Sequence, residues 1–143
     1  MQITMAGDYA VRSILHLVIN QDRSPISLSE ISKEQCIPKN FLYKVMQTLI
    51  QRGFVISHMG SSGGYALARD PKEITLREVV EAVEGPIYLN RCIMRPGMCP
   101  RDNYCSVHSV WHEVQNSLMS TLESYKMDHL ATKLKKNMAS TRK

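Results

Sequence analysis

Residues 27–53 read SLSEISKEQCIPKNFLYKVMQTLIQRG and contain two adjacent helix signals. Ser27 and Glu30 have the spacing of an N-terminal capping box, in which a hydroxyl and a carboxylate each satisfy a free backbone donor. Pro38 ends this first helix, because proline disfavours helix at the residue before it, and it suits the first turn of a second helix. The second helix is predicted to end near Arg52. Two short helices separated by three or four residues predict a helix-turn-helix.

The apolar residues within and before this segment indicate which faces are buried. Residues 6–20 carry apolar side chains at helical spacing and predict an amphipathic helix. Cys36 occupies an apolar position at the end of the first helix of the pair, and we interpret it as a core residue, since a lone buried cysteine behaves as a small hydrophobe. In the second helix of the pair, one apolar face is predicted to pack inward: Phe41, Leu42, Val45, Met46 and Leu49.

Two strand-like runs follow the helix-turn-helix. Residues 54–58 (FVISH) and 65–69 (YALAR) flank the turn 60–64 (GSSGG). Strands of this length around a glycine-rich turn predict a two-stranded hairpin. Behind a recognition helix, such a hairpin is interpreted as a wing.

A further helix is predicted after the wing. Thr75 and Glu78 repeat the capping-box spacing and open a helix that runs through about Val83, where Gly85-Pro86 ends it. Residues 1–84 are therefore predicted to form a winged helix-turn-helix domain. The fold class is mainly α with a small β-wing.

The remainder of the chain is predicted to contain a loop, a long helix and a tail. Residues 85–105 form the loop, and residues 106–135 form a helix that begins near Cys105. The basic tail 136–143 is predicted to be disordered. An apolar stripe nearly thirty residues long, at the end of a small chain, predicts a dimer interface. Its residues are Val107, Val110, Trp111, Val114, Leu118, Leu122, Tyr125, Leu130 and Leu134.

Composition narrows the class of protein. The chain has 143 residues and a net charge of +5, and because the positive surplus lies mostly after residue 125, the charge alone indicates little about nucleic acid. No run of eighteen apolar residues and no export signal are present, which predicts a cytoplasmic protein without a membrane segment. Four cysteines in that setting favour metal or redox chemistry over disulfides. We find no nucleophile–base pair, phosphate loop or paired carboxylates, so an enzyme is not expected.

The exposed face of the second helix of the pair carries residues suited to double-stranded DNA. Lysine and asparagine contact phosphates or base edges, and glutamine can bind adenine in bidentate fashion. Glycines at the wing tip allow backbone amides to approach the sugar–phosphate chain. The predicted DNA-binding residues are Lys39, Asn40, Tyr43, Lys44, Gln47, Ser61, Ser62 and Gly63. A winged helix that contacts only proteins is the alternative.

Cys92, Cys99, Cys105 and His108 form a candidate soft-metal site. Thiolates bind zinc, copper(I) or iron–sulfur clusters, and Cys105 and His108 share one face of a helical turn. Structural zinc sites more often contain a C-x-x-C pair, whereas the cysteines here are separated by six and five residues. A zinc staple, and reduced cysteines that bind nothing, remain as alternatives. No partner is expected for the other histidines, which are His16, His58, His112 and His129.

Several motifs together resemble the bacterial IscR/NsrR/RirA-type winged-helix iron–sulfur transcriptional regulators. The resemblance covers nearly the whole chain and includes the three-cysteine loop followed by His108 and Trp111. Its other motifs are Gly7–Val11, Phe41–Val45, Gly63–Leu67 and Glu84–Pro86.

The resemblance implies a homodimer on a palindromic operator and an iron–sulfur cluster that senses iron or cluster status, redox state or nitric oxide. In IscR-like members, three cysteines and a histidine hold a 2Fe–2S cluster, which maps onto Cys92, Cys99, Cys105 and His108. In NsrR-like members, a 4Fe–4S cluster takes a carboxylate from the other chain, and here Asp8 of the partner subunit stands at that position. A repressor controlled by a 2Fe–2S cluster is the favoured function. A regulator with a zinc staple or thiol switch, and an electron-transfer protein, are the alternatives.

Overall fold

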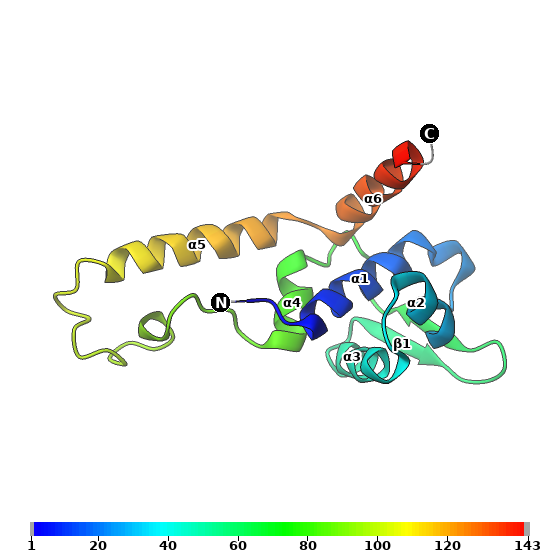
Figure 1. Ribbon diagram of the computed structural model, residues 1–143, viewed down its shortest axis with the longest axis horizontal. Helices are drawn as coiled ribbons and strands as arrows, with labels where there is room; N and C mark the ends of the chain where they lie inside the picture. The colour runs from blue at the N-terminus through cyan, green and yellow to red at the C-terminus, as the bar shows by residue number, and fades with distance from the viewer. Residues whose placement is uncertain (1, 142–143) are drawn as a thin grey trace.

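The computed structural model describes residues 2–141 as six α-helices, two short 3₁₀ helices and a two-stranded sheet (Figure 1). In chain order these are α1 (Met5–Ile19), η1 (Gln21–Arg23), α2 (Leu28–Gln35), α3 (Lys39–Gln51), β1 (Val55–His58), β2 (Gly64–Leu67), α4 (Leu76–Glu84), η2 (Arg91–Ile93), α5 (His108–Ser124) and α6 (Met127–Thr141). The predicted class, mainly α with a small β-wing, is confirmed.

Both predicted capping motifs form, but to different extents. The Ser27 hydroxyl accepts a hydrogen bond from the Glu30 amide, whereas the Glu30 carboxylate pairs with Arg23 at 2.7 Å instead of reaching back to the cap. At α4 the box is complete: the Thr75 amide donates to Glu78 Oε2 at 2.8 Å, and the Glu78 amide donates to Thr75 Oγ1 at 3.0 Å. Local sequence signals therefore place both helix starts correctly.

The core lies between α1, α2, α3 and α4, and two expected members of it are exposed. Phe41 is 55 % exposed, because it precedes the fully buried Leu42 by one residue and so lies about 100° around α3. Cys36 is also exposed. It adopts the left-handed conformation (φ 52°) at the C-cap of α2, and the adjacent Ile37 fills the core instead.

The wing forms as predicted. β1 and β2 pair antiparallel, with Val55 opposite Leu67 and His58 opposite Gly64. A backbone bridge between Ile26 and Tyr65 attaches the wing to the segment before α2. Gly64 allows this close approach, because a Cβ at that position would meet the Ile26 carbonyl. The wing is thereby fixed relative to the helix-turn-helix.

The prediction of one continuous helix over residues 106–135 is wrong. The chain breaks at Tyr125–Lys126, where the Leu76 amide donates to the Tyr125 carbonyl at 2.8 Å and the Met127 amide donates to the Ile74 carbonyl at 2.9 Å. This pairing removes residues 125–126 from the helical pattern and divides it into α5 and α6. Figure 1 shows α5 extending away from the domain, with α6 on the other side of the break.

The tail also differs from the expectation of disorder. Residues 136–141 continue α6, and residues 142–143 lie outside the described part of the chain. The helix is anchored by the buried Met127 and Ala131, and it packs against α1. Once its first two turns are held in this way, extending the helix costs little because each added residue gains a backbone hydrogen bond.

Candidate DNA-contacting surface and cysteine loop

The predicted DNA-binding residues of α3 lie on the side opposite its buried face. Lys39, Asn40, Tyr43 and Lys44 are exposed, while Gln47 is half-buried. The exposed Phe41 lies among them. Sequence reasoning missed Phe41 as a surface residue, since its spacing also fits the edge of the apolar stripe. The arrangement presents two lysines beside polar and aromatic side chains on one helix.

The wing tip offers a second polar surface. Ser61 and Ser62 are exposed and Gly63 is half-buried, in the turn between β1 and β2. In Figure 1, α3 and the wing lie along the same lower side of the domain, away from α6. Both α3 and the wing can therefore contact phosphates of one DNA molecule.

The scaffold behind this surface contains ion pairs and buried polar groups. Burial would raise the pKa of Glu78, but hydrogen bonds from the Thr75 backbone and from Arg69 outweigh it and lower the pKa. The Arg69–Glu78 pair, at 3.0 Å, joins the end of the wing to α4.

In α1, burial lowers the pKa of His16, whose Nδ1 lies 3.1 Å from the Gln35 amide nitrogen. A neutral His16 ring accepts a hydrogen bond from that amide.

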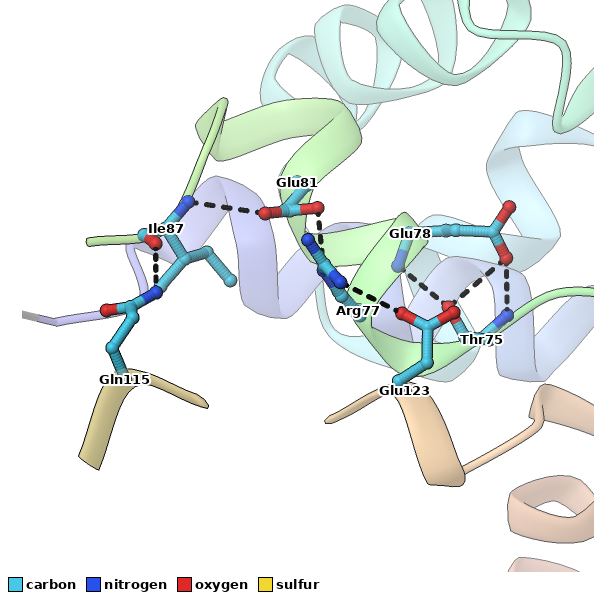
Figure 2. A network of polar contacts seen from close by, with 7 residues as sticks. All are labelled: Thr75, Arg77, Glu78, Glu81, Ile87, Gln115 and Glu123. Carbon is cyan, nitrogen blue, oxygen red and sulfur yellow. Dashed lines mark hydrogen bonds and ion pairs between the residues drawn. The ribbon is translucent and has the colours of Figure 1, made fainter. Parts of the chain in front are cut away.

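Gln115 attaches the start of the cysteine loop, residues 85–107, to α5 (Figure 2). Its side-chain oxygen accepts from the Leu89 amide at 2.9 Å, and its nitrogen donates to the Ile87 carbonyl at 2.7 Å. The Ile87 amide also donates to Glu81 on α4 at 3.4 Å. No local sequence signal marks this role, because a glutamine beside an apolar helix stripe is usually a surface residue.

Arg77 makes a second connection between α4 and α5. Its Nε donates to Glu81 at 3.1 Å and its Nη1 to Glu123 at 3.3 Å, as Figure 2 shows. Gln115 lies near the middle of α5 and Glu123 near its C-terminal end, so these bonds hold α5 at two points, one against the loop and one against α4. The loop is therefore attached to the domain through polar contacts rather than through a buried core.

The structure brings only part of the predicted ligand set together. Cys92, Cys99 and Cys105 are free thiols and half-buried. Cys92 and His108 line one cavity of about 250 Å³, and Cys99 and Cys105 lie outside its lining. Within residues 2–141, no three His, Cys, Asp or Glu side chains converge closely enough to hold a metal ion.

His108 has two partners that sequence reasoning missed. Its Nδ1 lies 3.0 Å from Asp102 Oδ1, and its Nε2 lies 2.8 Å from the Nε2 of His112. The expectation that His112 has no partner is therefore wrong. The spacing of four residues on a helix was the available signal, since such residues share one face.

The donor set nevertheless fits the chemistry of an iron–sulfur cluster. Three free thiols and one imidazole lie on a single loop and the helix turn that follows it. Asp102 lies beside His108 Nδ1, where carboxylates commonly stand beside metal-binding histidines, while His108 Nε2 contacts His112 in this structure. Asp8, the alternative ligand, pairs with Arg12 of its own helix at 3.1 Å.

Comparison with known proteins defines the family. Residues 3–133 match the model of Rrf2, described as an iron-dependent transcriptional regulator. The chain belongs to the Rrf2 family. This assignment makes it a transcriptional regulator and not an enzyme, as the sequence predicted.

Individual relatives of this Rrf2 protein agree with the assignment. IscR of Photorhabdus laumondii is 32 % identical over 130 residues, which cover 91 % of this chain and 79 % of that protein. The solved structure of T. potens IscR is 26 % identical, with a TM-score of 0.73, and covers 91 % of this chain and 86 % of that one. CymR, described as the global cysteine regulator of B. subtilis, has the same fold at 23 % identity, with a TM-score of 0.77 and coverage of 92 % and 97 %.

No helix that the structure describes in this Rrf2 protein is both long and apolar enough to span a membrane.

Proposed function

We propose that this Rrf2 regulator is a homodimeric repressor whose binding to a palindromic DNA operator is controlled by an iron–sulfur cluster. One combination of features carries the proposal: a winged helix with an exposed, lysine-bearing α3 and a loop of three free thiols followed by a histidine beside a carboxylate occur in one chain. The matched IscR proteins are named as helix-turn-helix transcriptional regulators, which supports the DNA-binding half.

In the proposed complex, α3 enters the major groove and the wing lies along the backbone. Lys39 and Lys44 contact phosphates, and Asn40, Tyr43 and Gln47 lie toward base edges. Ser61, Ser62 and Gly63 approach the adjacent sugar–phosphate chain. The phosphate contacts then position the protein on the DNA, and the base-edge contacts recognise the sequence.

The exposed apolar side of α5 supports the homodimer. Val107, Val110, Trp111 and Val114 are between 36 % and 49 % exposed. An apolar helix face of this kind is stabilised when a second copy covers it. We expect the full chain to elute as a dimer, and Trp111→Glu with Val110→Glu to give monomers. A wild-type monomer at micromolar concentration would contradict the homodimer.

For the cluster, Cys92, Cys99, Cys105 and His108 are the proposed ligands, and a 2Fe–2S centre is favoured over 4Fe–4S. When bound, the cluster would be the part of the protein that reacts with oxidants or nitric oxide, or that is lost when iron is scarce. The residues of this chain bind it: Asp102 lies beside the His108 ring, and the Gln115 contacts hold the start of the loop. The partner subunit's Asp8 is the rival fourth ligand.

Anaerobic purification tests the cluster directly. We expect a brown protein with charge-transfer bands in the visible range and equal amounts of iron and acid-labile sulfide. A colourless protein with stoichiometric zinc would contradict the proposal. His108→Ala and Asp8→Ala, made separately, identify the fourth ligand by which one bleaches or shifts the spectrum. His129→Ala and Asp22→Ala are the matched controls.

A zinc staple or thiol switch on the same DNA-binding protein is the second candidate. It is favoured by one observation, that Cys99 and Cys105 lie outside the cavity that Cys92 and His108 share. In that case operator binding is indifferent to iron but responds to an oxidant or a chelator. Operator titrations with reduced, oxidised and chelator-treated protein separate the two candidates.

A further inference from the structure

Phe41 is a large apolar side chain in the first turn of α3, and it is exposed. Its exposed fraction is 55 %, although α3 is held in place by three fully buried residues of the same helix, which are Leu42, Met46 and Leu49. These buried residues fix the rotation of α3 about its own axis. Phe41 therefore cannot turn into the core while the helix-turn-helix is folded.

Phe41 does not contribute to the packing of the domain. Within residues 2–141, the partly buried apolar residues that pack against the core include Ile50 of α3 and do not include Phe41. Burial of an aromatic ring is a large favourable contribution to folding or binding, and a ring that stays in water does not make it. A partner that covers Phe41 would gain this contribution on binding.

The neighbours of Phe41 indicate which kind of partner covers it. Lys39, Asn40 and Lys44 are exposed, and Lys44 shares a face of α3 with Phe41 because it lies three residues further along the helix. The buried centre of a protein–protein interface is depleted in lysine, whereas phosphates attract lysine. The N-terminal residues of a recognition helix contact base edges, and α3 begins at Lys39. The surroundings of Phe41 therefore favour DNA over a second protein.

The chemistry of the phenyl ring limits what it can recognise. The ring carries no hydrogen-bonding nitrogen or oxygen, so it cannot pair with the polar groups of a base edge. In the major groove, the 5-methyl group of thymine is the apolar group that a base edge presents. We propose that Phe41 packs against a thymine methyl group in each half-site of the operator and makes operator preference depend on that base pair. This inference rests on the proposed function, because it requires α3 to lie in the major groove.

The contact made by Phe41 differs in its salt dependence from the contacts proposed for the lysines of α3. Lys44 on a phosphate displaces a counterion, so its contribution falls as the salt concentration rises. Contact between a phenyl ring and a methyl group displaces no counterion. The preference for thymine should therefore stay constant over a range of salt concentrations in which the overall affinity falls.

Replacing thymine by uracil tests the contact, because it removes the 5-methyl group and leaves the hydrogen-bonding groups of the base unchanged. Selection from a random duplex library with the full-length chain, purified without air, first gives the operator. Each thymine is then replaced in turn by deoxyuridine. We expect one thymine in each half-site at which this change weakens binding by the native chain about three- to fivefold, as burial of one methyl group predicts. Phe41→Ala should bind at least tenfold more weakly and should not distinguish thymine from uracil at that position.

Phe41→Leu and Met138→Ala are the matched variants. Leucine keeps an apolar side chain, so Phe41→Leu should retain a preference for thymine over uracil. Met138 is also exposed and apolar, but it belongs to α6, which lies away from α3 in Figure 1. Met138→Ala should therefore bind the operator as the native chain does.

The possible failures of the inference and of the proposed function are distinguishable. An equal effect of uracil on the native chain and on Phe41→Ala, with both folded by circular dichroism, would overturn the contact. An enriched operator in which no thymine methyl group affects binding would overturn it as well, and both results leave the DNA-binding function intact. If the library gives no enriched sequence, the proposed function fails and the inference fails with it.

Discussion

Replacing Gln115 by alanine should release the start of the cysteine loop from α5. The substitution removes two hydrogen bonds, to the Leu89 amide at 2.9 Å and to the Ile87 carbonyl at 2.7 Å. Each such bond contributes ~0.5–1.5 kcal/mol net, so their loss lowers the free energy of local opening by about 1–3 kcal/mol. Since 1.4 kcal/mol corresponds to a factor of ten, the Leu89 amide should exchange about 5- to 150-fold faster.

Hydrogen–deuterium exchange of the native chain measures this effect residue by residue. Asn116→Ala is the matched control, because Asn116 is the exposed neighbour and makes neither contact. Gln115→Glu keeps the acceptor for Leu89 but places a carboxylate against the Ile87 carbonyl, and it should open the loop at that point. Equal protection of Leu89 in wild-type and Gln115→Ala protein would refute the assignment of Gln115 as the anchor.

Three further substitutions test other parts of the molecule. Lys44→Ala should weaken operator binding and reduce the slope of log K against log salt by about 1, whereas an unchanged slope in titrations at several salt concentrations argues against a phosphate contact. Met127→Ala should lower the free energy of unfolding, measured by urea denaturation, by about 2–5 kcal/mol, because Met127 is fully buried. Met138 is 48 % exposed, so Met138→Ala should change that free energy little. Burial lowers the pKa of His16 in the folded state, so below the ordinary histidine pKa of about 6.5 the unfolded state binds more protons than the folded state. The free energy of unfolding should therefore fall as the pH is lowered through that range. His16→Gln should reduce this pH dependence of the free energy of unfolding.

The winged helix could be predicted because its signals are local. Ser27, Pro38 and Thr75 mark helix starts through their own backbone chemistry, and the glycines of residues 60–64 mark the wing turn. Each acts over a few residues, so the prediction does not need the tertiary structure.

The features that were predicted wrongly from the sequence depend on contacts between residues far apart in the chain, or on the position of a residue around its helix axis. The break before Met127 carries no proline or glycine, and it follows from pairing with residues 74–76. Phe41 lies at the margin of the buried stripe, where spacing alone does not separate core from surface. The Asp102–His108–His112 arrangement depends on how the loop folds back on α5, and a histidine's spacing alone does not reveal a loop carboxylate.

The backbone pairing at residues 125–127 has a mechanical consequence. Because the Tyr125 carbonyl is bonded to the first residue of α4, and Met127 is fully buried in the domain, the junction between α5 and α6 is attached to the domain at a defined point. Thr75, the cap of α4, forms a backbone bridge with Lys126 at that point. From there Glu78 and Arg69 connect it to the end of the wing over a short path of hydrogen bonds.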